Sequence, residues 1–141
     1  MDLSRPRDVQ HLYEVEPIEE SGLIVRPGEF VLASTIETLR VLPALCCRLD
    51  GRSTLARLGL TVHCTATVID NNHHEHRSIV LEISNVGPMT IRVPYLHPVG
   101  MVVFERASAA VDPSDAQLQY AAQIGVTAPN LEFATSPFGI D

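Results

Sequence analysis

The sequence predicts an all-β domain, either a barrel or a jelly-roll-like sandwich, with one or two short helices. Short runs rich in Val, Ile, Thr or Phe recur along the chain, and Gly, Pro, Asn or Asp bounds each run. Only two stretches have the capping residues and composition of a helix. Many short strands separated by turn signals are typical of antiparallel sheets that close into a barrel or pack face to face.

The chain begins with a polar, acidic lead-in and continues with strands and turns. We expect residues 1–24 to form an irregular N-terminal arm, which ends near a Pro-Gly turn at 27–28. A barrel core is expected over 25–107 and a C-terminal helix and tail over 108–141, all within a single domain. The predicted strands are 30–35, 44–50, 61–70, 79–85, 89–93 and 100–107.

Alternation of side chains gives two of these strands a face directed at the core. In 79–85 the apolar face holds Ile79, Leu81 and Ile83, so Glu82 is the only charge and lies on the opposite face. In 61–70 the opposite face holds polar residues, including His63, and the predicted apolar face consists of Val62, Cys64, Ala66 and Val68.

The two predicted helices are short. In GRSTLARLGL (51–60), a helix is expected from Ser53 to Leu58, with Ser53 as its cap and Gly59 ending it. In PSDAQLQYAAQIG (113–125), Ser114 or Asp115 is the expected N-cap and Gly125 the stop.

Composition narrows the classes of function. The 141 residues carry a net charge of −7, which argues against a general nucleic-acid binder. All ten basic residues are arginine, the side chain suited to bidentate recognition of phosphate or carboxylate. Three cysteines, two of them adjacent, make a poor disulfide framework and fit a reducing cytoplasm. No apolar run approaches the ~20 residues that span a membrane.

The segment 51–60 concentrates positive charge and hydroxyl groups. Arg52 precedes the predicted helix start, where free backbone N–H groups attract anions. Ser53 and Arg57 are four residues apart and therefore lie on one helical face. These residues alone allow two interpretations, a phosphate cradle or a helical turn with solvated arginines.

The segments GRSTLARLGLTVHCTATVID, IVLEISNVGP and GMVVFER resemble the dCTP deaminase family, the deaminase branch of the dUTPase superfamily. The dUTPases share the Gly-Arg-Ser start and the Ile-Asp pair at 69–70, whereas Arg57 and Leu81-Glu82 mark the deaminase branch. The resemblance implies a dUTPase-like β-barrel that assembles as a homotrimer with active sites between subunits. It also implies a pyrimidine deoxynucleotide as ligand, with no nucleic-acid or membrane partner.

The resemblance implies a reaction as well, the metal-free hydrolytic deamination of dCTP or a related cytosine nucleotide. Glu82 would shuttle protons, while Ser53, Arg57 and the backbone of Ala66 would hold the attacking water. Asp70 would meet the 3′-hydroxyl of the deoxyribose. The implied nucleotide-binding residues are Arg52, Ser53, Thr54, Leu55, Ala56, Arg57, Asp70, Val80, Leu81, Glu82, Gln119 and Gln123.

The sequence predicts no catalytic metal ion. The zinc deaminases use a His-x-Glu pair with Pro-Cys-x-x-Cys, and this chain has no Cys-x-x-Cys, so we expect no catalytic zinc. Mg²⁺ is expected only with the nucleotide phosphates. The segment NNHHEHRS (71–78) contains His73, His74 and His76, but it lacks a second ligand cluster and is interpreted as a solvated hairpin loop.

Departures from the family pattern gather on the phosphate side. The 71–78 loop is two residues longer than usual and lacks glycine, and Val68 replaces an arginine. Gln119 aligns with a family lysine and Gln123 with a family glutamine, and the N-terminal region is shorter than in the family. The number of phosphates on the substrate is therefore left open.

Two alternative functions stay open. Asp70 within Ile-Asp also fits a dUTP pyrophosphatase, acting alone or coupled to deamination. The altered loop and ends also fit a non-catalytic trimeric barrel that binds a nucleotide or a protein partner.

Overall fold

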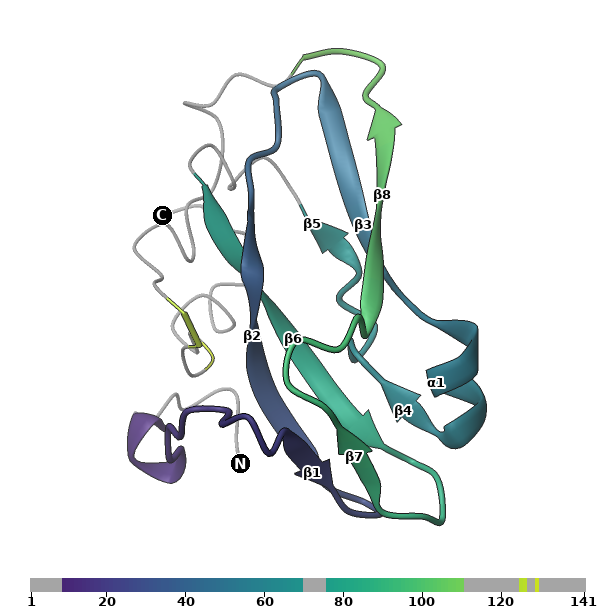
Figure 1. Ribbon diagram of the computed structural model, residues 1–141. Coiled ribbons are helices and arrows are strands. Elements are labelled where there is room, and N and C mark those ends of the chain that lie inside the picture. The colour runs from purple at the N-terminus through teal and green to yellow at the C-terminus, as the bar shows by residue number, and fades with distance from the viewer. Residues whose placement is uncertain (1–8, 70–75, 111–124, 127–128, 130–141) are drawn as a thin grey trace.

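The computed structural model describes residues 9–69, 76–110, 125–126 and 129. Eight antiparallel strands in this part of the chain form three small sheets, ordered β1–β7, β2–β6–β4 and β5–β3–β8 (Figure 1). The elements are η1 (Gln10–Leu12), β1 (Leu23–Val25), β2 (Phe30–Leu39), β3 (Leu45–Gly51), α1 (Ser53–Leu58), β4 (Leu60–Thr61), β5 (Val68–Ile69), β6 (Arg77–Asn85), β7 (Ile91–Val93) and β8 (Gly100–Arg106).

A single apolar core joins the three sheets. Each sheet contributes buried side chains from at least two strands, and burial of these groups is the main term that favours folding. The buried members are Val25, Ala33, Val41, Cys47, Leu49, Leu60, Ile69, Leu81, Ile83, Ile91 and Val93.

The strand predicted over 61–70 is wrong, because the segment is divided between two sheets. Its first residues form β4, which pairs with β6, and its last described residues form β5, which pairs with β3. Between them the chain crosses from one sheet to the other. Thr65 lies in the left-handed region at φ +73°, and its carbonyl accepts the N–H of Thr67 at 3.0 Å. We call 62–67 the crossing segment.

The buried face predicted for this segment is therefore wrong as well. Val62 is buried, but Cys64, Ala66 and Val68 are exposed. Alternation along the chain describes a strand that stays in one sheet, and the pairing partners that divide this segment are distant in sequence.

The other strand predictions agree with the structure apart from their ends. β2 extends to Leu39, and β7 begins at Ile91 rather than at residue 89. In β6, Leu81 and Ile83 are buried as predicted, and Glu82 lies on the opposite face. The helix predicted over 113–125 lies outside the described residues except for Gly125. No helix in the described part of the chain is long and apolar enough to span a membrane.

β2 contains a bulge, at which the hydroxyl of Thr35 forms hydrogen bonds with the backbone. The register of β2 against β6 shifts between Ser34 and Thr38. At this point Thr35 Oγ1 accepts the N–H of Ile79 at 2.9 Å and donates to the carbonyl of Glu37 at 2.7 Å. The side chain thus replaces a ladder hydrogen bond that the bulge removes.

Candidate functional site

The helix α1 begins at Ser53, the residue predicted to be its cap, so the cap lies one residue earlier than predicted. Arg52 is the N-cap, with an extended backbone at φ −99° and ψ 132°, and its carbonyl accepts the N–H of Ala56 at 2.9 Å. No side-chain hydrogen bond caps the helix, so the prediction that Ser53 is the cap is wrong. A backbone that is already extended at Arg52 makes Ser53 the first helical residue.

The end of α1 at Gly59 is confirmed. Gly59 has φ +91°, and its N–H bonds the carbonyls of Leu55 and Ala56. A Cβ on Gly59 would overlap the backbone of Gly87, so this position requires glycine for its conformation and for its space.

The side chains of α1 divide between the core and solvent. Leu55 packs against the core and fixes the helix to the sheets. The exposed residues of the segment are Arg52, Ser53, Thr54, Ala56, Arg57 and Leu58. Within the described part of the chain, neither Arg52 nor Arg57 forms an ion pair. Their charges are therefore not neutralised by a carboxylate described in this structure.

Glu82 is held by the crossing segment through its side chain and its backbone. Its Oε2 accepts the N–H of Cys64 at 2.6 Å, and its own N–H donates to the carbonyl of Val62 at 3.1 Å. A hydrogen bond from a backbone N–H to a carboxylate is charge-assisted and short. The carboxylate is thus held at Cys64 of the crossing segment, and Ala66 of the same segment is exposed.

Strand β6 carries Glu82 and also pairs with β4, the strand that follows α1, so it links the two predicted parts of the site. Glu82 is near the middle of this strand, and the end of the strand pairs with β4, which follows α1 directly (Leu60 opposite Asn85). Figure 1 shows α1 beside β4 at the end of the molecule where β6 finishes. Among the described residues, no hydrogen bond or ion pair joins Arg57 or Ser53 to Glu82.

The remaining predicted site residues have different outcomes. Val80 is half-buried and Leu81 is buried on β6. Asp70, Gln119 and Gln123 lie outside the described residues.

The sequence did not reveal the partner of Glu82. The donor is the backbone N–H of Cys64, which any residue except proline would supply, so no side-chain pattern marks it.

The histidines are the remaining candidates for metal ligands. In the part of the chain that is described, no set of three His, Cys, Asp or Glu residues is placed to hold a metal ion. His76 is exposed, and His73 and His74 lie outside that part. His63 Nδ1 is buried without a hydrogen-bond partner among the described residues. The expected absence of catalytic zinc stays a prediction.

Comparison with known proteins identifies relatives of this chain. The dCTP deaminase-like family matches residues 1–107. A "dCTP deaminase, dUMP-forming" of Methanothermobacter thermautotrophicus is 37% identical over 112 residues, which are 79% of this chain and 56% of that protein. The protein of the same name from Dictyoglomus turgidum is 36% identical over 129 residues, or 89% of this chain and 64% of the relative. The chain thus spans between 56% and 64% of the length of these two relatives.

A solved structure supports the fold. The native EIAV dUTPase superposes with a TM-score of 0.53 at 15% sequence identity, covering 70% of this chain and 86% of that one. This likeness shows a dUTPase-like all-β fold. Because the family model matches residues 1–107, which is most of the chain and includes α1, the crossing segment and β6, the chain belongs to the dCTP deaminase-like family.

Proposed function

We propose that this chain carries the catalytic centre for hydrolytic deamination of a cytosine deoxynucleotide, dCTP or a related nucleotide, to the uracil nucleotide. The observation that carries the proposal is the Glu82 carboxylate, fixed by the Cys64 N–H on the face of β6 opposite the core. Membership of the dCTP deaminase-like family supports it.

In the proposed reaction, water adds to C4 of the cytosine ring and ammonia leaves. The water oxygen bonds to C4, and the bond from C4 to the amino nitrogen breaks. Through Glu82, one water proton passes to N3, where it stays in the uracil product, and the other passes to the amino group, which leaves as ammonia. Because Oε2 of Glu82 accepts the Cys64 N–H, Oε1 is the oxygen assigned to proton transfer. Ser53, Arg57 and the backbone of Ala66 would hold the water, without a catalytic metal.

The same arrangement suggests how a nucleotide would bind. Arg52 and the hydroxyls of Ser53 and Thr54 are exposed together and would contact phosphates. The backbone of Val80 and Leu81 would meet the base, and Asp70 the deoxyribose. The other proposed contacts are Leu55, Ala56, Gln119 and Gln123. The start of α1 offers no carboxylate, so Mg²⁺ would arrive with the phosphates.

We also propose that the sites form between subunits of a homotrimer. In the described part of the chain no hydrogen bond or ion pair joins Arg57 to Glu82, and the family resemblance implies sites of this kind. In this arrangement α1 of one subunit faces Glu82 of its neighbour. The free cysteines Cys46, Cys47 and Cys64 suit the proposed cytoplasmic location.

A deamination assay on the purified chain tests the main proposal. Loss of cytosine absorbance and release of ammonia are measured with dCTP, dCMP and CTP at millimolar concentration. Glu82→Gln keeps a carbonyl that accepts the Cys64 N–H but cannot take a proton, so turnover should fall by about 10²–10⁴-fold. Nucleotide affinity, measured by calorimetry, should stay within about twofold, because the substituted amide has nearly the same size as the carboxylate.

The matched control is Glu105→Gln, which removes an exposed carboxylate paired with Arg48 on the sheet β5–β3–β8. It should leave turnover unchanged. No deamination of any of the three nucleotides by the unmodified chain would refute the proposal, and binding without turnover would instead support a non-catalytic nucleotide-binding barrel.

A second candidate is a bifunctional enzyme that also releases pyrophosphate. It is favoured by the relatives named "dCTP deaminase, dUMP-forming". The balanced reaction is dCTP plus two waters giving dUMP, ammonia and pyrophosphate. Formation of dUMP and pyrophosphate in step with ammonia supports this candidate, whereas accumulation of dUTP contradicts it.

A further inference from the structure

We propose that Asn85 is a positioning residue that fixes α1 on its own subunit and so sets where Arg57 lies opposite Glu82 of the neighbouring subunit. This inference rests on the proposed function of Glu82 and Arg57. β6 carries Glu82, and three residues later it carries Asn85, the one buried polar residue among those described.

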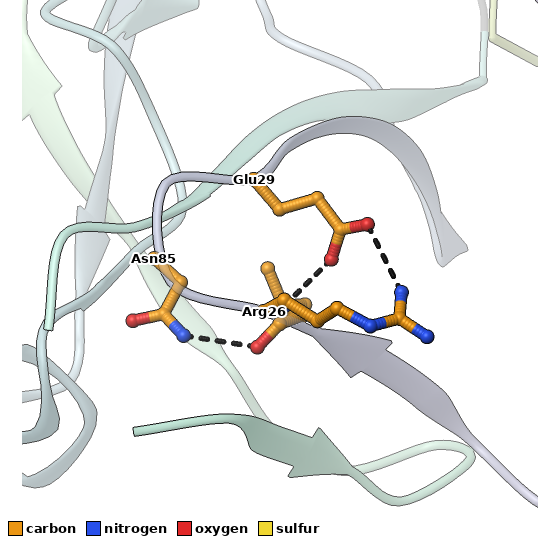
Figure 2. Close-up of polar contacts among 4 residues, drawn as sticks. Arg26, Glu29 and Asn85 are labelled. Atoms are coloured by element: carbon orange, nitrogen blue, oxygen red, sulfur yellow. Dashed lines mark hydrogen bonds and ion pairs between the residues drawn. The ribbon is translucent and has the colours of Figure 1, made fainter. Parts of the chain in front are cut away.

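Asn85 is completely buried and uses its side-chain amide fully. Nδ2 donates to the carbonyl of Val25 at 2.9 Å and to that of Met89 at 2.7 Å, and Oδ1 accepts the N–H of Gly87 at 3.0 Å. One side chain therefore joins the end of β1 to the turn between β6 and β7. Figure 2 shows Asn85 reaching the Val25 carbonyl beside the turn that contains Arg26 and Glu29.

The backbone of Asn85 secures the same region. Its N–H donates to the carbonyl of Glu29 at 3.1 Å, and its carbonyl accepts the N–H of Gly28 at 2.8 Å. The turn at 26–29 is itself held by the Glu29 carboxylate, which accepts the backbone N–H of Arg26 at 2.6 Å. Asn85 is therefore the point at which β1, β2 and the β6–β7 turn are tied together.

The contacts continue from this turn to α1. Gly87, which Asn85 Oδ1 holds, lies so close to the carbonyl of Leu58 that a Cβ would overlap it. The N–H of Val86 donates to the carbonyl of Gly59 at 2.9 Å. The C-terminal end of α1 thus rests on the turn that Asn85 shapes, and Arg57 is the residue before Leu58.

An apolar residue at 85 would continue the row of Leu81 and Ile83 but would remove this partner from three backbone groups, of which the Val25 carbonyl is buried and the other two are partly buried. The turn would then rearrange, and α1 would move with it. Because a displacement of about 1 Å can lower turnover by about 10²-fold, we expect the loss of Asn85 to appear in catalysis.

The test compares two variants at the contacts that hold the end of α1 with a control variant that should also lower stability. Asn85→Ala removes the amide. Gly87→Ala keeps the Asn85 amide but forces a Cβ against the carbonyl of Leu58 and brings it to 3.3 Å from Asn85 Oδ1. Because Gly87 does not have a positive φ, the variant adds no left-handed strain. The control Val41→Ala removes core volume in the β2–β3 connection, at the opposite end of the molecule from α1 (Figure 1).

Two quantities are measured at a temperature at which all variants are folded. Asn85→Ala and Gly87→Ala should lower kcat by at least about 10-fold with a change in KM below about threefold, whereas Val41→Ala should keep kcat within about twofold. Native-state exchange of the Ala56 and Val86 amides should quicken by at least about 10-fold in the first two variants relative to the control.

The outcomes separate this inference from the proposed function. If the unmodified chain does not deaminate, the proposed function fails, and the amide exchange still decides whether Asn85 seats α1. If Ala56 and Val86 exchange no faster in Asn85→Ala and Gly87→Ala than in Val41→Ala, the inference is overturned. If Asn85→Ala does not fold, Gly87→Ala against Val41→Ala decides.

Discussion

Thr65 has a backbone conformation that β-branched residues rarely adopt. Its φ of +73° lies in the left-handed region, where the Cβ approaches the following carbonyl. It follows Cys64, whose N–H holds Glu82. Unfavourable backbone conformations often occur at functional sites, where surrounding contacts maintain them. In this chain the contact between Cys64 and Glu82 lies directly beside the strained residue.

Replacing Thr65 by glycine should remove this strain. We expect Thr65→Gly to raise the free energy of unfolding by up to about 1 kcal/mol, because the left-handed penalty of about 1–2 kcal/mol exceeds the entropic cost of glycine. Thr67→Gly, two residues along and without a positive φ, should lower it by about 0.5–1 kcal/mol. Urea unfolding of both variants measures the difference, and an equal loss in both would contradict the role assigned to Thr65.

The buried thiol of Cys47 should make the free energy of unfolding depend on pH. Burial raises the pKa of the Cys47 thiol, and the adjacent Cys46 raises it further. The folded state therefore favours the protonated thiol. The resulting stability is fully present below the pKa of the unfolded chain's thiol, and it is lost as the pH rises through the raised pKa of the folded state.

The free energy of unfolding should accordingly fall more steeply between neutral and alkaline pH in the original chain than in Cys47→Ala. Urea titrations at several pH values in this range provide the measurement, and the other titrating groups cancel in the comparison. Parallel curves for the two proteins would show that Cys47 contributes nothing to the slope. The exposed Cys64 should react with a thiol reagent before Cys47 does.

At the scale of elements, α1 depends on what surrounds its end. A helix of six residues is too short to be stable alone, so its tertiary contacts determine whether it forms. Leu55 provides one contact with the core, and the close approach of Gly59 to Gly87 provides another.

Alanine variants of two glycines with similar backbone angles distinguish the cost of backbone conformation from the cost of tight packing. Gly59 (φ +91°) adjoins Gly87, whereas a Cβ on Gly28 (φ +78°) would meet nothing within 4 Å. Both alanine variants incur the left-handed penalty of about 1–2 kcal/mol, but Gly59→Ala should cost roughly 1–3 kcal/mol more because it also overpacks. Thermal or urea unfolding measures both costs, and equal values would mean that α1 is not packed tightly against the turn.

The same elements explain what could be predicted from sequence. β6 and α1 were predicted correctly because their evidence is local: alternation for Leu81, Glu82 and Ile83, and a left-handed glycine after Leu58. The interpretation of 61–70 as one strand failed because β4 and β5 pair with strands distant in the sequence. The hydrogen bond from Cys64 to Glu82 depends on that crossing, so it could not be predicted either.

At the scale of the whole molecule, the proposed site requires more than one subunit. The sheet β5–β3–β8 exposes large apolar side chains, with Val68 67%, Met101 51% and Phe104 53% exposed. Val68 and Met101 pair with Arg48 and Asp50 and so share one face, whereas Phe104 pairs with Cys47 and lies on the other face. Exposed apolar groups on one face of a sheet are consistent with burial against other copies of the chain. Analytical ultracentrifugation should accordingly detect a particle of three chains.

Mixing two inactive variants tests whether sites lie between subunits. Arg57→Ala and Glu82→Gln should each be inactive alone. After subunit exchange in an equal mixture, about a quarter of the sites would combine an intact α1 with an intact β6, so about a quarter of the activity should return. A mixture of two separate preparations of Glu82→Gln is the control. No recovery despite proven exchange would place both groups of a site in one chain.

Asn85 also restricts the ways in which β6 can pair incorrectly. Alternation already disfavours a slip by one residue, because such a slip would bury Glu82 and expose Leu81 and Ile83. It does not disfavour a slip by two residues, which returns apolar side chains to the core. In that alignment the amide of Asn85 would lose the carbonyl of Val25, which is distant in sequence, and a buried amide donor without a partner is costly. A single polar side chain in an apolar row therefore selects the native alignment of β6 among alternatives that hydrophobicity alone would accept.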